Sequence, residues 1–405
     1  MKFIENSVCA PIGFLGAGIH AGIRKNPDKK DLAIIFCTVP CVSAAVYTTN
    51  KVKGAPIVVT KKHLADGVAQ AVIVNSGNAN TCNADGEKKA KMMCAAAAQA
   101  LNINEKDVIV ASTGVIGQSL PIEPIFESVG KLAEKLSGKE GAAEVAQAII
   151  TTDTRTKECA VEFELGGKIC RIGAVAKGSG MIHPNMATML CFITTDVQIS
   201  KELLKKAIVN ASAETFNMIS VDGDTSTNDM VSIMASGGAG NEPIYDKNEA
   251  YKLFCNALLA ICTHMAKELA RDGEGATKLI QCKVSNAKTL KIGRIVAKSV
   301  ITSNLFKAAM FGEDANWGRI LCAIGYAPAV FNINRISVSI SSSAGEVAVC
   351  AKGVGVPFSE ELAPKVLAED EITIAIDMKS GKSSATAYGC DLTYDYVKIN
   401  GDYRS

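Results

Sequence analysis

The chain has 405 residues, of which 48% are hydrophobic and 21% are charged. Its 43 basic and 41 acidic residues leave a net charge of +2, and neither sign gathers into a long block. This composition supports a sizeable core and offers no electrostatic support for binding nucleic acid or a membrane surface.

Short apolar runs rich in β-branched residues alternate with helical stretches along the chain. Strands are predicted at 32–38, 56–60, 71–75, 108–112, 189–193, 335–341, 346–351 and 371–377. Helices are predicted at 85–101, 123–136, 201–214 and 248–270. The glycine-dense segment 235–240 is interpreted as a loop rather than a domain border. The pattern predicts an α/β fold with much non-parallel sheet.

The cysteines and histidines bear on compartment and metal binding. The 14 cysteines are spread singly from Cys9 to Cys390, several inside apolar runs, and no C-x-x-C occurs. They are typical of small core residues in a reducing compartment, and with four histidines we expect no metal site. The N-terminus lacks the apolar stretch of a secretory signal, and no stretch of about 18 uninterrupted apolar residues occurs. We therefore expect a cytoplasmic protein without a membrane span.

The segment 177–191 joins a lysine, a glycine turn, a histidine-proline pair and a threonine, in the order Lys-Gly-Ser-Gly-Met-Ile-His-Pro-Asn-Met-Ala-Thr-Met-Leu-Cys. A threonine hydroxyl needs a base to act as a nucleophile, and the α-amino group of the same residue serves once the preceding peptide bond is cut. Its pKa of roughly 7.7 to 8.0 suits that task near neutral pH. From the residues alone, a glycine-rich loop leading into a buried strand is the alternative interpretation.

Two further features carry groups that can take part in catalysis or substrate binding. Thr113 and Gly114 follow the predicted strand 108–112, where exposed N–H groups and a hydroxyl can hold an oxyanion, although an ordinary turn has the same sequence. An amino-acid acceptor carries a carboxylate and an ammonium group. Lys177 offers a cation and Glu274 an anion for these groups, although each is also typical of solvated surface.

Other motifs fail on inspection. Segment 16–22 has the wrong third-glycine spacing for a dinucleotide fingerprint, and no G-x-x-x-x-G-K-[ST] occurs. The run from Asp222 resembles a calcium loop but has Thr227 in place of glycine and Ile233 in place of glutamate. His183 is the imidazole nearest to the threonine in sequence, and we interpret His183-Pro184 as a structural bend.

The chain resembles the ornithine acetyltransferases of arginine biosynthesis in ordered blocks over essentially its whole length. The blocks are 10–14, 22–25, 47–50, 75–80, 112–117, 151–154, 177–191, 222–229, 273–278, 316–319 and 396–400. The resemblance implies self-cleavage between Ala187 and Thr188, giving an α fragment, 1–187, and a β fragment, 188–405. It also implies a layered α/β (α+β) fold shared with self-processing aminopeptidases, in which mixed sheets flanked by helices form one body from both fragments.

The same resemblance implies roles for individual residues. Thr188 is the nucleophile, and Thr113 and Gly114 form the oxyanion hole. The residues expected to contact the substrate are Thr151, Lys177, Thr188, Glu274, Asn400 and Ser405. The last two imply that the C-terminus folds back into the site. Arg404 stands where many relatives have a small residue, and this departure bears on Ser405.

The implied reaction moves the acetyl group of N2-acetylornithine to glutamate through an acetyl-Thr188 intermediate, without a cofactor or a metal. Some family members also accept acetyl-CoA. The implied assembly is a heterotetramer of two α and two β fragments. One alternative is a self-processing aminopeptidase or amidohydrolase of the same fold. Another is a non-catalytic relative, against which the intact Ala187-Thr188 context argues.

Overall fold

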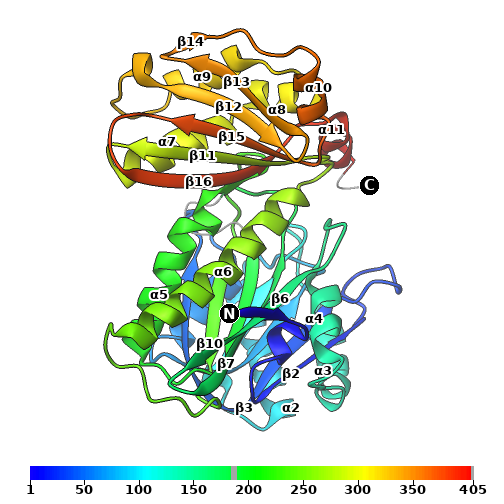
Figure 1. Ribbon diagram of the computed structural model, residues 1–405. Helices are drawn as coiled ribbons and strands as arrows, with labels where there is room; N and C mark the ends of the chain where they lie inside the picture. The colour runs from blue at the N-terminus through cyan, green and yellow to red at the C-terminus, as the bar shows by residue number, and fades with distance from the viewer. Residues whose placement is uncertain (184–188, 403–405) are drawn as a thin grey trace. The chain divides into compact units, whose positions relative to one another are not determined.

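The computed structural model describes residues 1–183 and 189–402, so Ala187, Thr188, Arg404 and Ser405 lie outside the described residues. The chain divides into two compact units, which are drawn in Figure 1. Unit 1 comprises Met1–Gly178, Pro184–Asn217 and Thr225–Met265; unit 2 comprises Ser179–His183, Met218–Asp224 and Ala266–Ser405. The backbone therefore passes repeatedly between the units, and neither unit is one continuous segment.

Unit 1 is built on a nine-stranded mixed sheet in the order β1-β6-β7-β8-β10-β3-β4-β5, with β2 paired to β3. Its strands are β1 (Lys2–Ile4), β2 (Phe14–Ile19), β3 (Leu32–Tyr47), β4 (Val68–Asn75), β5 (Val108–Ser112), β6 (Lys157–Leu165), β7 (Lys168–Lys177), β8 (Leu190–Thr195) and β10 (Met230–Ala235). Its helices are α1 (Ala55–His63), α2 (Gly86–Leu101), α3 (Glu123–Glu134), α4 (Gly141–Ile149), α5 (Lys201–Glu214) and most of α6 (Glu249–Arg271).

Both faces of this sheet are buried, which explains the uninterrupted apolar runs in the sequence. Leu32 and Ile34 of β3 pack in one core cluster with α2 and α3. Ala33 and Ile35 point to the other face and pack in a second cluster with α4. Strands covered on both faces need apolar residues at every position, as the predicted buried strands have.

Helices α5 and α6 run side by side in unit 1, where the hydroxyl of Tyr251 in α6 donates to the carbonyl of Leu203 in α5 at 3.4 Å (Figure 1). Among the described residues, only α6 is long and apolar enough to cross a membrane by length and composition. Half (50%) of its most apolar 18-residue stretch is buried in the structure, and a buried core helix can be equally long and apolar. This feature is therefore weak evidence for a membrane span.

Unit 2 contains a second mixed sheet in the order β14-β13-β12-β15-β11-β16-β9. Its strands are β9 (Ile219–Ser220), β11 (Leu279–Ala287), β12 (Ser337–Ser342), β13 (Gly345–Ala351), β14 (Val354–Gly355), β15 (Glu371–Asp377) and β16 (Ser383–Cys390). Its helices are α7 (Leu290–Ile301), α8 (Asn304–Phe311), α9 (Trp317–Gly325), α10 (Leu362–Leu367) and α11 (Tyr394–Gly401).

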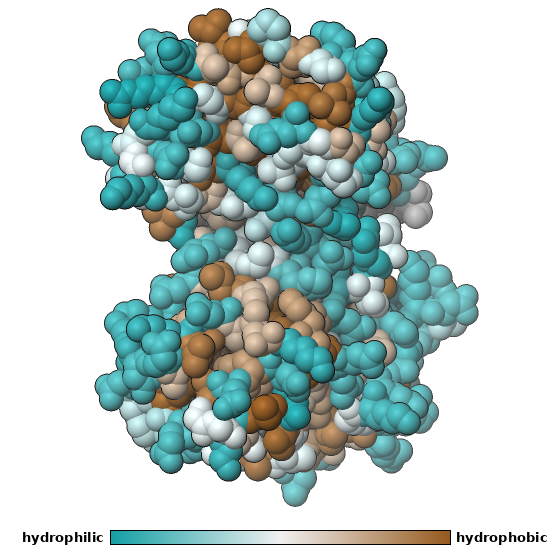
Figure 2. All heavy atoms as spheres, in the orientation of Figure 1, coloured by the Kyte–Doolittle hydropathy of each residue, from teal (hydrophilic) through white to brown (hydrophobic). Residues whose placement is uncertain are grey.

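The sheet of unit 2 buries one face against its helices. In β15, Ile372, Ile374 and Ile376 are fully buried in a cluster with α7 to α10, while the alternate residues Thr373 and Ala375 are only half-buried. This period of two is typical of a strand with one covered face. Figure 2 shows hydrophilic and hydrophobic residues interspersed on the visible face of each unit, as the balanced composition predicts.

The mixed α/β fold class is confirmed, and several elements have the predicted bounds. The strands 108–112 and 371–377 and the helix 201–214 agree with β5, β15 and α5. The predicted strand 56–60 is wrong, because this segment lies in helix α1. Pro56 occupies the first turn, where its fixed φ and missing N–H favour a helix, and three basic residues occupy the last turn. Burial of Pro56, Ile57, Val59 and Thr60 overrides the strand preference of the β-branched residues.

Helix α1 provides hydrogen-bond partners for the edge strand of the sheet in unit 1. Strand β5 is the last strand in its order, so one side of its backbone lacks a neighbouring strand. The Thr60 hydroxyl donates to the carbonyl of Val110 at 2.8 Å and accepts from the Val110 N–H at 2.9 Å. One buried hydroxyl therefore satisfies both backbone groups at the centre of the edge strand.

Replacing Thr60 by valine should destabilise the protein, since it keeps the shape and leaves two buried backbone groups without partners. We expect the free energy of unfolding, measured by urea denaturation, to fall by about 2–4 kcal/mol. Thr60→Ser, which retains the hydroxyl, is the control and should lose much less. A Thr60→Val protein as stable as wild type would show that solvent satisfies Val110.

Candidate active site

The chain that carries the predicted nucleophile enters the sheet of unit 1 at β8. In the antiparallel pairing of β7 with β8, Lys177 is the partner of Leu190, two residues after Thr188 in the sequence. On the other side, the N–H of Met230 donates to the carbonyl of Met189 at 2.9 Å. Although Thr188 lies outside the described residues, the segment directly after it is fixed between β7 and β10.

Lys177 brings two other predicted site residues together. Its ammonium group donates to the Thr151 hydroxyl at 2.8 Å and to the Thr113 hydroxyl at 3.2 Å. The side chain is buried, and burial lowers the pKa of Lys177, while the negative charge of Asp153 acts in the opposite direction. Three residues separated by up to 64 positions thus converge where β7 ends.

Asp153 fixes the position of Lys177, a role that the sequence prediction missed. Its carboxylate accepts from the ammonium of Lys157 at 2.6 Å and from the backbone N–H groups of Thr151 at 2.9 Å and Gly178 at 2.7 Å. Burial alone would raise the pKa of Asp153, but the charges of Lys177 and Lys157 outweigh it and hold that pKa below its ordinary value. A sequence signal existed in the charged pair Asp153 and Lys157 at a spacing of four.

Gly114 adopts a conformation that other residues rarely reach. Its φ is +131°, and a Cβ atom would lie 2.8 Å from the backbone nitrogen of Asn78. The neighbouring Thr113 N–H donates to the Asn75 carbonyl at 3.0 Å, whereas the Gly114 N–H has no acceptor within residues 1–183 and 189–402. The turn therefore offers one unused N–H beside the Thr113 hydroxyl, which is the donor set that an oxyanion requires.

Two asparagines hold this turn in place. The Asn75 side-chain oxygen accepts from the N–H groups of Gly77 at 3.1 Å and Asn78 at 3.0 Å. The Asn228 amide donates to the carbonyls of Ala79 at 2.6 Å and Ser112 at 2.9 Å. Both belong to blocks that carry the family resemblance, and their contacts show that these blocks support the turn at Gly114.

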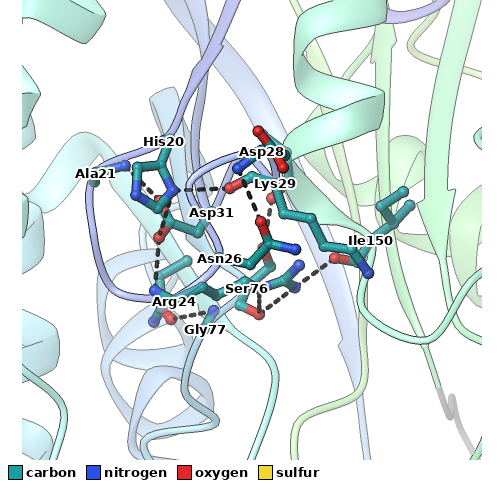
Figure 3. A network of polar contacts seen from close by, with 12 residues as sticks. His20, Ala21, Arg24, Asn26, Asp28, Lys29, Asp31, Ser76, Gly77 and Ile150 are labelled. Atoms are coloured by element: carbon teal, nitrogen blue, oxygen red, sulfur yellow. Dashed lines mark hydrogen bonds and ion pairs between the residues drawn. The ribbon is translucent and has the colours of Figure 1, made fainter.

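A third support comes from the loop after β2, which is shown in Figure 3. The buried carboxylate of Asp31 accepts from the N–H groups of Ala21 at 2.6 Å and Arg24 at 2.8 Å, and so shapes the loop. The Arg24 guanidinium then reaches the carbonyls of Ser76 and Ile150. Ile150 directly precedes Thr151, so Arg24 fixes the backbone leading to that substrate-binding candidate.

Unit 2 holds the second group of predicted residues. The Asn400 amide of α11 donates to the Glu274 carboxylate at 2.9 Å, and Glu274 is 6% exposed. The Glu274 N–H donates to the Ser179 carbonyl at 3.1 Å. Gly180 also lies against Glu274, because a Cβ atom there would come within 2.3 Å of its carboxylate oxygen. The structure therefore pairs Glu274 with Asn400, whereas Ser405 lies outside the described residues.

The segment just before residue 184 is anchored within unit 2. The Asp222 carboxylate accepts from the Ile182 N–H at 2.8 Å, and the Val221 N–H donates to the Ile182 carbonyl at 2.7 Å. His183 contacts the Ser220 hydroxyl at 3.1 Å, and burial together with the charge of Lys298 lowers the pKa of His183 to about 4. These contacts hold in place the backbone segment that contains His183.

Within the described part of the chain, no cluster of three or more His, Cys, Asp or Glu residues has the arrangement of a metal site.

Comparison with known proteins identifies the class of the chain. The model of the ArgJ family matches residues 16–405. The arginine biosynthesis bifunctional protein ArgJ of Symbiobacterium thermophilum is 50% identical and covers 100% of both chains. The ArgJ protein of Bacillus subtilis is 46% identical over 99% of this chain and 97% of its own. A crystal structure of the Bacillus halodurans ArgJ protein is 45% identical with a TM-score of 0.50, and covers 53% of this chain and 99% of its own.

These matches place the chain among the acyltransferases of arginine biosynthesis. The chain belongs to the ArgJ family. The family predicted from the sequence blocks is therefore confirmed.

Replacing Gly114 by alanine should impair acetyl transfer, because the added methyl group meets the backbone of Asn78 and displaces the unused N–H. We expect the transfer rate to fall by at least about 10²-fold, which is the effect of losing one oxyanion donor. Gly117→Ala is the matched control, since Gly117 also has positive φ, at +78°, but nothing lies within 4 Å of its Cβ position. Equal rates for the two variants would place the oxyanion donors elsewhere.

Proposed function

We propose that the chain transfers the acetyl group of N2-acetylornithine to glutamate through an acetyl ester of Thr188, after cutting itself between Ala187 and Thr188. The observation that carries the proposal is the convergence of Lys177, Thr113 and Thr151 beside Leu190, where the chain from Thr188 enters the sheet. Membership of the ArgJ family supports this reaction over hydrolysis by an aminopeptidase of the same fold.

The proposed reaction needs only groups of the protein. The α-amino group of Thr188, freed by the cut, takes the proton of its own hydroxyl as the oxygen attacks the acetyl carbonyl. The C–N bond of N2-acetylornithine breaks, and the proton goes to the departing ornithine amine. The glutamate amine then attacks the acetyl ester, and the threonine oxygen recovers its proton. No cofactor enters this exchange.

The oxyanion of each tetrahedral intermediate requires donors that are already in position. We assign this role to the Thr113 hydroxyl and the Gly114 N–H. The nearby ammonium group of Lys177, 3.2 Å from the Thr113 oxygen, adds a positive charge in a buried setting. Charges and dipoles fixed before the reaction stabilise a developing oxyanion more strongly than mobile water does.

Substrate recognition is assigned to groups that match an amino acid. From the family resemblance we assign Thr151 and Lys177, which provide a hydroxyl and a cation, and Glu274 and Asn400, which provide an anion and an amide. We assign Ser405 to the same role from the family resemblance. A buried carboxylate such as Glu274 suits an ammonium group, because pairing compensates the cost of burying both charges.

The two fragments would remain associated after the cut. Strands β8 and β10 from 188–405 lie between β7 and β3 from 1–187 in one hydrogen-bonded sheet. The solved Bacillus halodurans chain spans 53% of this chain, about the share that follows Ala187, and this supports the cut itself. We propose a heterotetramer of two α and two β fragments in the cytoplasm. The name "bifunctional" of the relatives supports acetyl-CoA as a second donor.

The variant Thr188→Ala is the simplest test of the proposal. It lacks the one hydroxyl that is required both for self-cleavage and, later, as the nucleophile of acetyl transfer. We expect wild type to run as two fragments on a denaturing gel, one beginning at Thr188, and Thr188→Ala to run as a single inactive chain. Thr188→Ser keeps a hydroxyl and should still be cut. An uncleaved protein with full acetyl-transfer activity would contradict the mechanism.

Glu274→Gln should weaken amino-acid binding without affecting self-cleavage. Losing a charged hydrogen bond of about 1.5–3 kcal/mol should raise KM by roughly 10- to 100-fold. Glu346→Gln, on the exposed side of β13, is the control and should leave KM unchanged. If Glu274→Gln instead stays uncleaved, the residue supports the backbone before the cut rather than the substrate.

A further inference from the structure

Asp229 is a buried carboxyl group that the mechanism above does not use. It directly precedes β10 and is 2% exposed. Its Oδ2 atom has no hydrogen-bond partner among the residues that the structure describes. An unsatisfied buried carboxyl oxygen is costly and uncommon, so its presence calls for a specific explanation.

The sheet register places Asp229 beside the start of β8. In the parallel pairing of β10 with β8, Met230 is the partner of Leu190, and the Met230 N–H donates to the Met189 carbonyl. Asp229 and Met189 are therefore neighbours on adjacent strands, which lie roughly 4.8 Å apart in a sheet. Met189 is covalently bonded to Thr188. Strand β8 thus begins between Lys177 at the end of β7 and Met230 at the start of β10, with Asp229 directly before Met230.

The surroundings of Asp229 favour a neutral acid that is able to give up its proton. Burial raises the pKa of Asp229 well above its ordinary value. The Ser226 hydroxyl, the charge of Lys177 and the Thr48 hydroxyl act in the opposite direction and lower that pKa. The Lys177 ammonium on the opposite side already donates to two hydroxyls. Asp229, by contrast, has a carboxyl oxygen without a partner among the described residues.

We propose that Asp229 donates the proton to the leaving nitrogen when the Ala187–Thr188 bond is cut. This inference rests on the proposed self-cleavage. The Thr188 oxygen bonds to the Ala187 carbonyl carbon, and the C–N bond breaks as the Asp229 proton passes to the Thr188 nitrogen. The hydroxyl proton of Thr188 returns to the Asp229 carboxylate. Water then hydrolyses the Ala187 ester, releasing a free Thr188.

Pulse-labelled full-length chain, followed on denaturing gels, measures the rate of the cut directly. In Asp229→Asn, which keeps the size but has no acidic proton, we expect the cut to slow by about 10² to 10⁴-fold, the range of general acid catalysis. Asp229→Glu restores the acid and should recover most of the rate. Added hydroxylamine, which cleaves esters, should not accelerate the cut in Asp229→Asn, because the ester does not form.

Asp196→Asn is the matched control, because Asp196 is also fully buried and lies at the other end of β8. It accepts from the N–H groups of Ile12 at 3.1 Å and Arg171 at 2.7 Å. This variant should be cut within a few-fold of the wild-type rate. The inference is overturned if Asp229→Asn is cut as fast as wild type, or if hydroxylamine cleaves it rapidly. The inference is also overturned if the rate of the cut falls equally in Asp229→Asn and Asp196→Asn and Asp229→Glu does not restore it. An uncut wild type would instead refute the proposed function itself.

Discussion

The pairing of β8 with both of its neighbours is the constraint on which the site depends. Strand β8 lies inside the sheet, held by β7 on one side and β10 on the other, and its residues are fully buried. A strand paired on both sides cannot slip by one residue without breaking its backbone hydrogen bonds to both neighbours and exchanging the side chains that pack in the two cores. Its first residue, Leu190, is therefore held opposite Lys177, two residues after Thr188 in the sequence.

Burying the charges of this site is costly, and the structure compensates the cost locally. Lys157 and Asp153 are fully buried and form an ion pair at 2.6 Å, and Asp153 also influences the pKa of Lys177. Such a group of charges is held together by its mutual contacts, and removing one member leaves the others uncompensated. Lys177 therefore has a fixed position, and burial lowers its pKa although the charge of Asp153 acts in the opposite direction.

Local sequence patterns predicted the buried strands and long helices because their apolar periodicity is set by burial itself. They failed at α1, where Pro56 outweighed the β-branched residues, and they ended β3 too early. Strand β3 continues past Pro40 because its pairing with β4 shifts register between Phe36 and Cys41. The resemblance supplied Thr113, Lys177 and Glu274, but it gave no role to Asp153 or Asp229. Their roles depend on contacts between strands that are distant in sequence.

The central claim is that acetyl groups pass through Thr188, and intact mass spectrometry tests it most directly. Wild-type protein is incubated with N2-acetylornithine in the absence of glutamate, then denatured, and its fragments are weighed. Our account predicts one added acetyl group on the fragment that begins at Thr188 and none on the other, with loss of that group when glutamate is added. An unmodified fragment under conditions of full turnover, or an acetyl group on another residue, would contradict it.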